Sequence, residues 1–126
     1  MNPTTFRLFD SIGAGVHKAL DLRQVQHSLS ASNLANADTP GYRAREIPFG
    51  VLLSEAVDAA ERGESTSMNE EIREIEPVAW ALDGNSVSAE HEAVKLTENS
   101  LFYNALSTGM SRHLALLRFA ASNGRP

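Results

Sequence analysis

The 126-residue sequence contains no cysteine, which excludes disulfide bonds, thiolate nucleophiles and cysteine-based zinc sites. Aromatic residues make up only 6% of the chain, so we expect a lean hydrophobic core. No apolar run approaches the roughly 18 to 20 residues of a membrane span, since Arg118 ends the strongly apolar stretch 114–117. No basic segment followed by an apolar region opens the chain, so we expect no secretory signal peptide.

Catalytic and metal-binding motifs are also missing from the sequence. No histidine forms an i, i+4 pair with another, so we interpret all four as solvated surface residues: His17, His27, His91 and His113. There is no Gly-x-Ser-x-Gly nucleophile elbow and no phosphate-binding glycine loop. We therefore expect a protein that is not an enzyme and that needs no cofactor and no metal.

The charge balance argues against nucleic acid as a partner. The net charge is −5 at pH 7, with 11 basic residues scattered among 16 acidic residues. A phosphate-binding surface needs clustered lysine and arginine. Helices on a membrane surface usually carry a Lys/Arg-rich polar face, whereas the polar faces here are mixed and acidic, so membrane-surface binding stays a minor alternative.

Apolar residues recur at helical spacing near the N-terminus. Asn2 and Pro3 are typical of a helix start, and the pattern predicts a helix from Phe6 to about Asn36. Its apolar seam comprises Phe9, Ile12, Val16, Ala19, Leu22, Val25 and Leu29. Gly13 and Gly15 fall inside this helix. We interpret them as a kink or fraying of its first turns, with close approach of another helix as the alternative.

A second long helix is predicted at the C-terminal end. Ser88 is a good N-cap, and the helix should continue to about Ala121, a length of roughly 45 to 50 Å. Its apolar and small residues alternate by three and four positions: Ala93, Leu96, Ser100, Tyr103, Ser107, Met110, Leu114, Leu117 and Ala121. A seam this narrow buries too little to stand alone, so the two long helices should pair with each other.

The fold class follows from these patterns. We predict a mainly α protein, with long terminal helices paired as an antiparallel coiled-coil-like hairpin. The middle is irregular and contains a short helix from Phe49 to about Ala60, a mobile polar loop at 61–71 and an extended arm at 72–82 anchored by Trp80. We divide this one structural unit into an N-terminal helix and turn (1–42), a middle segment (43–85) and a C-terminal helix (86–126).

The most specific stretch is ASNLANADTPGY at 31–42. Pro40 and Gly41 fit positions i+1 and i+2 of a type II turn, so the first helix should end at or before Asp38. Asn33 and Asn36 lie three residues apart and share one helix face. Their spacing fits either an ordinary frayed helix end or a polar patch for a neighbouring chain.

This stretch resembles the N-terminal signature of the bacterial flagellar rod and hook proteins. The matching residues are Asn33, Asn36, Thr39, Pro40, Gly41, Tyr42 and Arg43. The stretches DGNSV (83–87), LTENSLFYNAL (96–106) and LLRFA (116–120) narrow the resemblance to the flagellar basal-body rod proteins, and among them to the proximal rod proteins. It covers both terminal helices and leaves 61–78 unmatched.

The resemblance implies a structural subunit of the proximal rod, assembled through its terminal helices into the axial drive shaft that transmits torque. It also implies flagellar type III export without a cleaved signal peptide, and a place in the periplasmic rod of the basal body. The implied partners are copies of the chain, other flagellar rod proteins, and the MS-ring/rod junction protein and export gate at the rod base. No direct membrane span is implied.

The resemblance also implies which residues contact other subunits. They are the signature residues named above together with seam residues of the C-terminal helix: Leu96, Tyr103, Met110, Leu114 and Leu117. The alternatives are a soluble coiled-coil adaptor or chaperone-like homodimer that uses the same seams, and a sibling protein of the proximal rod.

Overall fold

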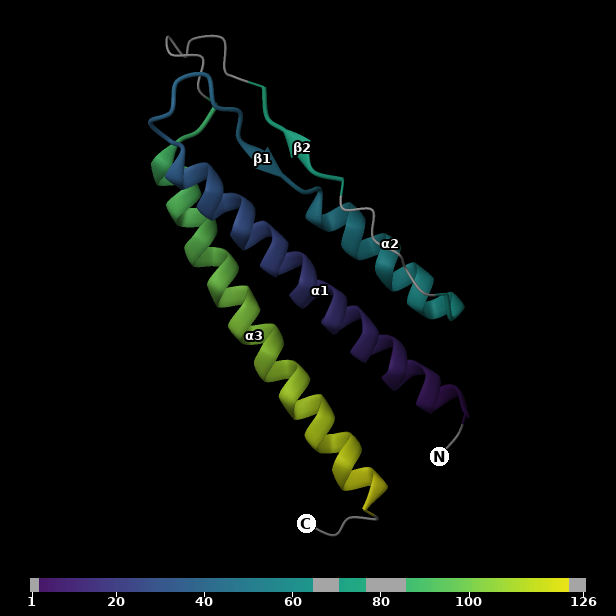
Figure 1. Cartoon of the computed structure of the whole chain (residues 1–126). Helices are drawn as coiled ribbons and strands as arrows, with labels where there is room; N and C mark the ends of the chain where they lie inside the picture. The colour runs from purple at the N-terminus through teal and green to yellow at the C-terminus, as the bar shows by residue number, and fades with distance from the viewer. Residues whose placement is uncertain (1–2, 65–70, 77–85, 123–126) are drawn as a thin grey trace.

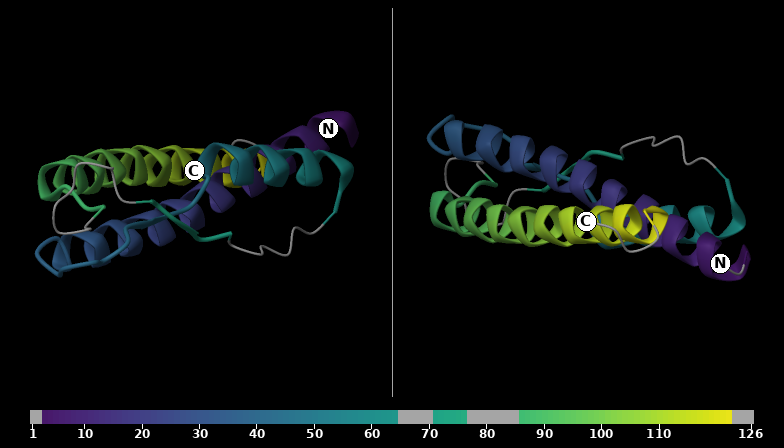
Figure 2. Two further views of the ribbon diagram at one scale, coloured as in Figure 1. Left: turned by 90° about the horizontal axis from the view of Figure 1, so that it is seen from above. Right: turned by 90° about the horizontal axis from the view of Figure 1, so that it is seen from below.

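The computed structural model describes residues 3–64, 71–76 and 86–122, with side chains from Asp10 onward. Its elements are α1 (Pro3–Ala35), β1 (Arg45–Glu46), α2 (Phe49–Arg62), β2 (Arg73–Glu74) and α3 (Ala89–Ala121). In Figure 1, α1 and α3 lie side by side and run in opposite directions, so both chain ends lie at one end of the molecule. Figure 2 shows that α1 crosses α3 obliquely. The predicted antiparallel helical hairpin is confirmed.

α1 begins at Pro3, whose missing N–H is harmless in a first turn, and it continues without a break through Gly13 and Gly15. A Cβ at Gly13 would lie 3.5 Å from the His113 ring of α3, and a Cβ at Gly15 would lie 3.5 Å from Val57 of α2. The structure therefore supports the alternative interpretation, in which neighbouring helices pack against these glycines, over a kink or fraying.

α2 is confirmed from Phe49 and extends to Arg62, two residues beyond the predicted end. Gly63 stops it with a left-handed φ of +72°. Its N–H donates to the Ala60 carbonyl at 3.1 Å, and that of Glu64 donates to the Ala59 carbonyl at 2.9 Å. Glu61 and Arg62 thus belong to the helix and not to the predicted loop. Residues 65–70 of that loop lie outside the described residues.

Part of the predicted extended arm forms a strand. β2 pairs antiparallel with β1, Arg45 opposite Glu74 and Glu46 opposite Arg73. The Ile75 N–H also donates to the Ala44 carbonyl at 2.7 Å. The arm thus joins a two-stranded sheet beside α1. Trp80 and the turn at 83–85 lie outside the described residues.

The hydrophobic core lies between α1, β1 and α2. Its buried cluster is Leu22, Leu29, Ile47 and Leu52, with Val25, Phe49 and Leu53 packed against it. The prediction that the two long helices pair with each other is confirmed, since α1 packs along α3. The fully buried apolar side chains of α1 lie toward the middle segment, which the sequence did not indicate.

α3 contributes only polar side chains to the buried set, Glu92 and Asn99. Leu96, Met110 and Leu117 are half-buried, whereas Ala93 and Ser100 of the predicted seam are exposed. The Asn99 side chain donates to the Arg23 carbonyl of α1 at 2.7 Å, which turns Asn99 inward in place of its neighbour Ser100. The predicted helix and its Ser88 cap are confirmed, since the Ser88 side chain accepts from the His91 N–H.

No helix within the described ranges has both the length and the apolar character needed to cross a bilayer.

Candidate subunit interface

Asn33 is the hub of one end of the hairpin. It is only 1% exposed. Its side-chain nitrogen donates to the Arg45 carbonyl at 2.9 Å, and its side-chain oxygen accepts from the Arg45 N–H, also at 2.9 Å. One amide therefore pairs both main-chain groups of Arg45, as a strand residue would. The Asn33 side chain faces the interior of the subunit, which does not fit an exposed patch at this residue.

The turn after α1 has the predicted form. The Tyr42 N–H donates to the Thr39 carbonyl at 3.2 Å, and Gly41 has a φ of +72°, as the third residue of a type II turn requires. The Tyr42 hydroxyl donates to the Asn33 side-chain oxygen at 3.4 Å and lies 3.3 Å from the Ser32 hydroxyl. The ring is thus held against the helix end.

The other predicted residues of this stretch lie nearer the surface. Asn36 is half-buried, and its side chain donates to the Ser32 carbonyl of the last helical turn at 2.8 Å. Thr39, Pro40 and Gly41 are exposed at the tip of the hairpin. Arg43 is also exposed and pairs with Glu76 at 3.0 Å.

The start of α3 is joined to the same end of the molecule. Glu92, 3% exposed, accepts from Asn33 at 3.3 Å and from Lys95 at 2.9 Å. Ser86 accepts from the Ala44 N–H at 2.7 Å and donates its own N–H to the Tyr42 carbonyl at 3.3 Å. We call Asn33, Tyr42, Arg45, Ser86 and Glu92, with these hydrogen bonds, the polar junction.

Arg23 links the two helices that flank α1. Its guanidinium carbon lies 4.0 Å from the centroid of the Phe49 ring in α2 and 4.5 Å from that of Phe102 in α3. It also donates to the Asn99 side-chain oxygen at 3.4 Å. Burial lowers the pKa of the guanidinium from its ordinary value, while the Glu98 carboxylate acts in the opposite direction. Sequence reasoning missed this residue, because a single arginine on a helix carries no signal of its partners.

The predicted seam residues of α3 are incompletely covered. Leu96, Met110 and Leu117 are half-buried, while Tyr103 and Leu114 are 40% and 46% exposed. Met110, Leu114 and Leu117 line an open groove of about 350 Å³ whose α1 side runs from Asp10 to His17. This side of α3 therefore meets α1 loosely near the chain ends.

The opposite side of α3 was missed by the sequence analysis. Val94, Leu101, Leu116 and Phe119 are each more than half exposed. Their positions bring them to one face of the helix, away from the side that carries Glu92 and Asn99. We call these four residues the outer stripe. The helical spacing of these apolar residues is visible in the sequence, but the sequence analysis assigned only one apolar seam to this helix.

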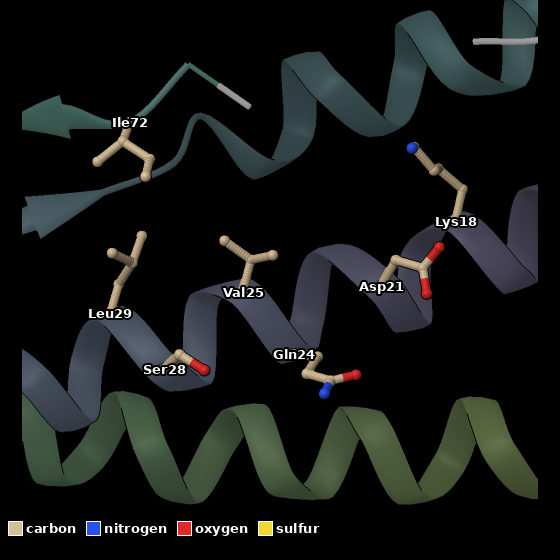
Figure 3. Close-up of a pocket in the computed structure, with 7 residues that line it drawn as sticks. All are labelled: Lys18, Asp21, Gln24, Val25, Ser28, Leu29 and Ile72. Atoms are coloured by element: carbon tan, nitrogen blue, oxygen red, sulfur yellow. The ribbon is translucent and has the colours of Figure 1, made fainter. Parts of the chain in front are cut away.

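A further groove lies between α1 and the strand β2. Figure 3 shows Ile72 of this groove pointing toward Leu29 of α1, with Lys18 and Asp21 farther along the helix. Its volume is about 590 Å³, and its lining carries charges of both signs. Across the described part of the chain, no three acidic or histidine side chains are grouped so that they could hold a metal ion.

These features define a class of protein. One end of the hairpin is closed by buried hydrogen bonds, and a long helix presents large apolar side chains to solvent. Exposed apolar surface of this kind marks a site of contact with other chains. The fold and the surface are those of a helical subunit that packs beside other subunits.

Similarity to known proteins identifies the family of this subunit. A sequence model of the family described as "Flagella basal body rod protein" matches residues 18–43, the second half of α1 and the turn. The flagellar basal body rod protein FlgB of Cereibacter sphaeroides is 35% identical over 121 residues, covering 84% of this chain and 91% of the relative. FlgB of Escherichia coli K12 is 31% identical over 111 residues, covering 75% and 80%, and FlgB of Aeromonas hydrophila is 34% identical over 102 residues, covering 71% and 76%.

The chain belongs to the FlgB family of flagellar basal body rod proteins. It is a structural subunit of the bacterial flagellar rod, a protein of motility. The alternatives, a soluble adaptor or chaperone-like homodimer and the sibling proximal rod protein FlgC, are not favoured by these relatives.

Proposed function

We propose that the chain transmits torque as part of the axial drive shaft through helix-to-helix contacts between neighbouring subunits. The observation that carries this proposal is the uncovered apolar surface of α3, whose buried side chains are polar. Burial of an exposed leucine or phenylalanine contributes about 1.5 to 3 kcal/mol. Assembly would bury several at once.

The turn at the tip of the hairpin is proposed to set the position of one subunit against the next. Thr39, Pro40 and Gly41 are exposed there, while the polar junction fixes the backbone beneath them. A rigid, exposed turn offers a fixed shape to a neighbour without a large loss of conformational entropy. Arg43 lies exposed beside it in an ion pair with Glu76, which adds polar groups to this surface.

The partners follow from the family. We infer that the chain packs against copies of itself and other flagellar rod proteins, and at the rod base against the MS-ring/rod junction protein and the export gate. We further infer a position in the periplasmic rod, reached through the flagellar type III export channel. We infer no catalytic role for the subunit.

The proposal is tested in a strain whose only copy of the gene carries an epitope tag. Basal bodies purified from this strain are expected to contain the chain in the proximal rod, and electron microscopy with an antibody to the tag locates it. Deletion of the gene should stop rod assembly and motility. Complete rods formed without the chain would contradict the proposed role.

Solution behaviour separates a rod subunit from an adaptor. We expect the purified chain to be largely monomeric at micromolar concentration by sedimentation velocity. Both of its ends should be sensitive to protease in solution and become resistant only in the assembly. A stable helical homodimer under the same conditions would instead favour the adaptor.

A further inference from the structure

Charge is divided along the chain. All 16 acidic residues lie among residues 1–98, together with eight of the 11 basic residues, which gives this part a net charge of −8. Residues 99–126 contain three arginines and no acidic residue, a net charge of +3. The second half of α3 is therefore basic, whereas the rest of the molecule is acidic.

Most of the outer stripe lies in this basic half. Leu101, Leu116 and Phe119 are 66%, 64% and 57% exposed, and Arg112 is exposed between them along the helix. In Figure 1, no described element lies on the side of α3 that faces away from α1. Val94, the remaining member of the stripe, lies four residues from Glu90 and from Glu98 and so has acidic neighbours.

A complementary surface lies on the other flank of α1. A groove of about 360 Å³ between α1 and α2, bordered also by Leu106 of α3, is lined largely by apolar side chains, among them Ile12 and Val57. Glu61 also lines it, and the exposed Asp58 lies one helical turn before Glu61. This groove would take an apolar side chain that has a basic neighbour.

We propose that the basic half of the outer stripe of one copy docks into the groove between α1 and α2 of a second copy. Phe119 and Leu116 enter the groove, and Arg112 lies toward Glu61 and Asp58. The contact rests on the proposed function and specifies which surfaces meet. Because the two surfaces differ, each bound copy leaves one stripe and one groove free, and the contact continues as an open series instead of closing as a dimer.

Cysteine cross-linking tests this contact, since the chain has no cysteine of its own. The double variant Val57→Cys/Phe119→Cys is expressed as the sole copy, and isolated basal bodies are treated with a mild oxidant. No Cα of α2 lies within 8 Å of one of α3, a separation too large for a disulfide within one chain. A ladder of dimers, trimers and larger products on a denaturing gel is the expected result.

The matched control is Val57→Cys/Val94→Cys, which places the second thiol on the same helix face but between acidic residues. It should give no ladder. An equally strong ladder from the control would overturn the proposal. So would a product from Phe119→Cys alone that stops at the dimer, a cross-link to a different rod protein in place of the ladder, or no ladder in basal bodies that contain the chain at wild-type level.

A charge reversal gives an independent readout in the double-cysteine background. Arg112→Glu should lower the ladder yield about tenfold, and Glu61→Arg should restore it, with unchanged helicity by circular dichroism in each variant. Unchanged yield in Arg112→Glu would overturn the proposal. Basal bodies that form without the wild-type chain would overturn the proposed function itself, whereas normal incorporation without a ladder removes only this contact.

Discussion

Asn33 acts as a strand partner although it lies on a helix. Its amide satisfies the N–H and the carbonyl of Arg45 on the edge of β1 away from β2, and its nitrogen also reaches Glu92 of α3. A single side chain thus sets the positions of α1, β1 and α3 relative to one another. Replacement of this amide leaves both main-chain groups of Arg45 without their partner. Main-chain groups that lose their partners cost free energy, so the effect exceeds that of one hydrogen bond.

We expect Asn33→Ala to lower the free energy of unfolding by about 3 kcal/mol, since it leaves both main-chain groups of Arg45 and the Glu92 carboxylate without this partner. Chemical denaturation of the purified chain followed by circular dichroism measures the change.

Ser30→Ala is the matched control. Ser30 is also 1% exposed, but its hydroxyl makes no hydrogen bond to any described residue. Removal of a buried hydroxyl that has no partner should change the stability by less than about 0.5 kcal/mol or increase it. Equal losses in the two variants would show that burial alone, and not the hydrogen bonds of Asn33, determines the effect.

Gly41→Ala should reduce rod assembly more than it reduces folding. The residue has a φ of +72° with open space around its missing Cβ, so alanine costs only about 1 kcal/mol of backbone strain. Motility and rod yield in a complemented deletion strain, compared with thermal unfolding of the purified variant, provide the measurement.

Gly63→Ala is its control, because Gly63 has the same φ of +72° and equally open surroundings at the end of α2. It should lose similar stability and still assemble. Normal motility of Gly41→Ala would count heavily against a role for the turn between subunits.

At the scale of the elements, the helices contribute differently to the fold. α1 and α2 share the apolar core around Leu22, whereas α3 is joined to α1 by Asn99, Glu92 and half-buried side chains. Truncation of a leucine should therefore change the free energy of unfolding much more in α1 than on the exposed face of α3.

Leu22→Ala should lower the free energy of unfolding by about 3 kcal/mol, because Leu22 is fully buried and alanine leaves a cavity. Leu101→Ala removes the same atoms from a side chain that is 66% exposed. It should change the stability of the isolated subunit by less than about 0.5 kcal/mol. Urea denaturation of both variants checks the pair, and a large loss in Leu101→Ala would mean that α3 packs through its outer stripe within one chain.

The elements whose signals are local were predictable from the sequence. Pro3 and Ser88 start the two long helices, and Pro40 with Gly41 forms the turn after the first. Each signal depends on the conformation of a few consecutive residues, which composition and spacing reveal directly. The left-handed Gly63 is a signal of the same kind that the prediction of a polar loop overlooked.

The remaining features depend on partners far along the chain. Asn33 contacts Arg45 and Glu92, 12 and 59 residues away, so its spacing from Asn36 left two interpretations open. Glu92 lies in the first turn of α3, where the helix dipole favours a carboxylate, and nothing in its local sequence indicates that it is buried against Asn33. A repeat of three and four residues also cannot show which of two apolar faces on α3 turns inward. The subunit-contact residues in the turn and on α3 stay predictions.

At the scale of the whole molecule, we expect the local stability of the two long helices to decline from the polar junction toward the chain ends. Buried hydrogen bonds join α1, β1 and α3 at the junction, whereas an open groove separates α1 from α3 near Met110 and Leu117. No residue of α3 after Asn99 is fully buried within the described part of that helix.

Amide hydrogens of α3 beyond Leu101 should therefore exchange faster than those of α1 between Leu22 and Leu29 in the isolated chain, and should become protected in the assembled rod. Hydrogen exchange followed by mass spectrometry measures both states. Uniformly slow exchange throughout the isolated chain would contradict this gradient and the need for neighbours to complete the fold.

The oblique crossing of α1 and α3 beyond the polar junction has a geometric consequence for a shaft (Figure 2). The polar junction joins the two helices at one end, whereas the groove beside Met110 and Leu117 leaves them loosely packed at the other. A small change in the separation of α1 and α3 near Leu117 alters the outline of the subunit without breaking a hydrogen bond of the polar junction. Copies of the same chain can then fit between different neighbours at successive positions along the rod.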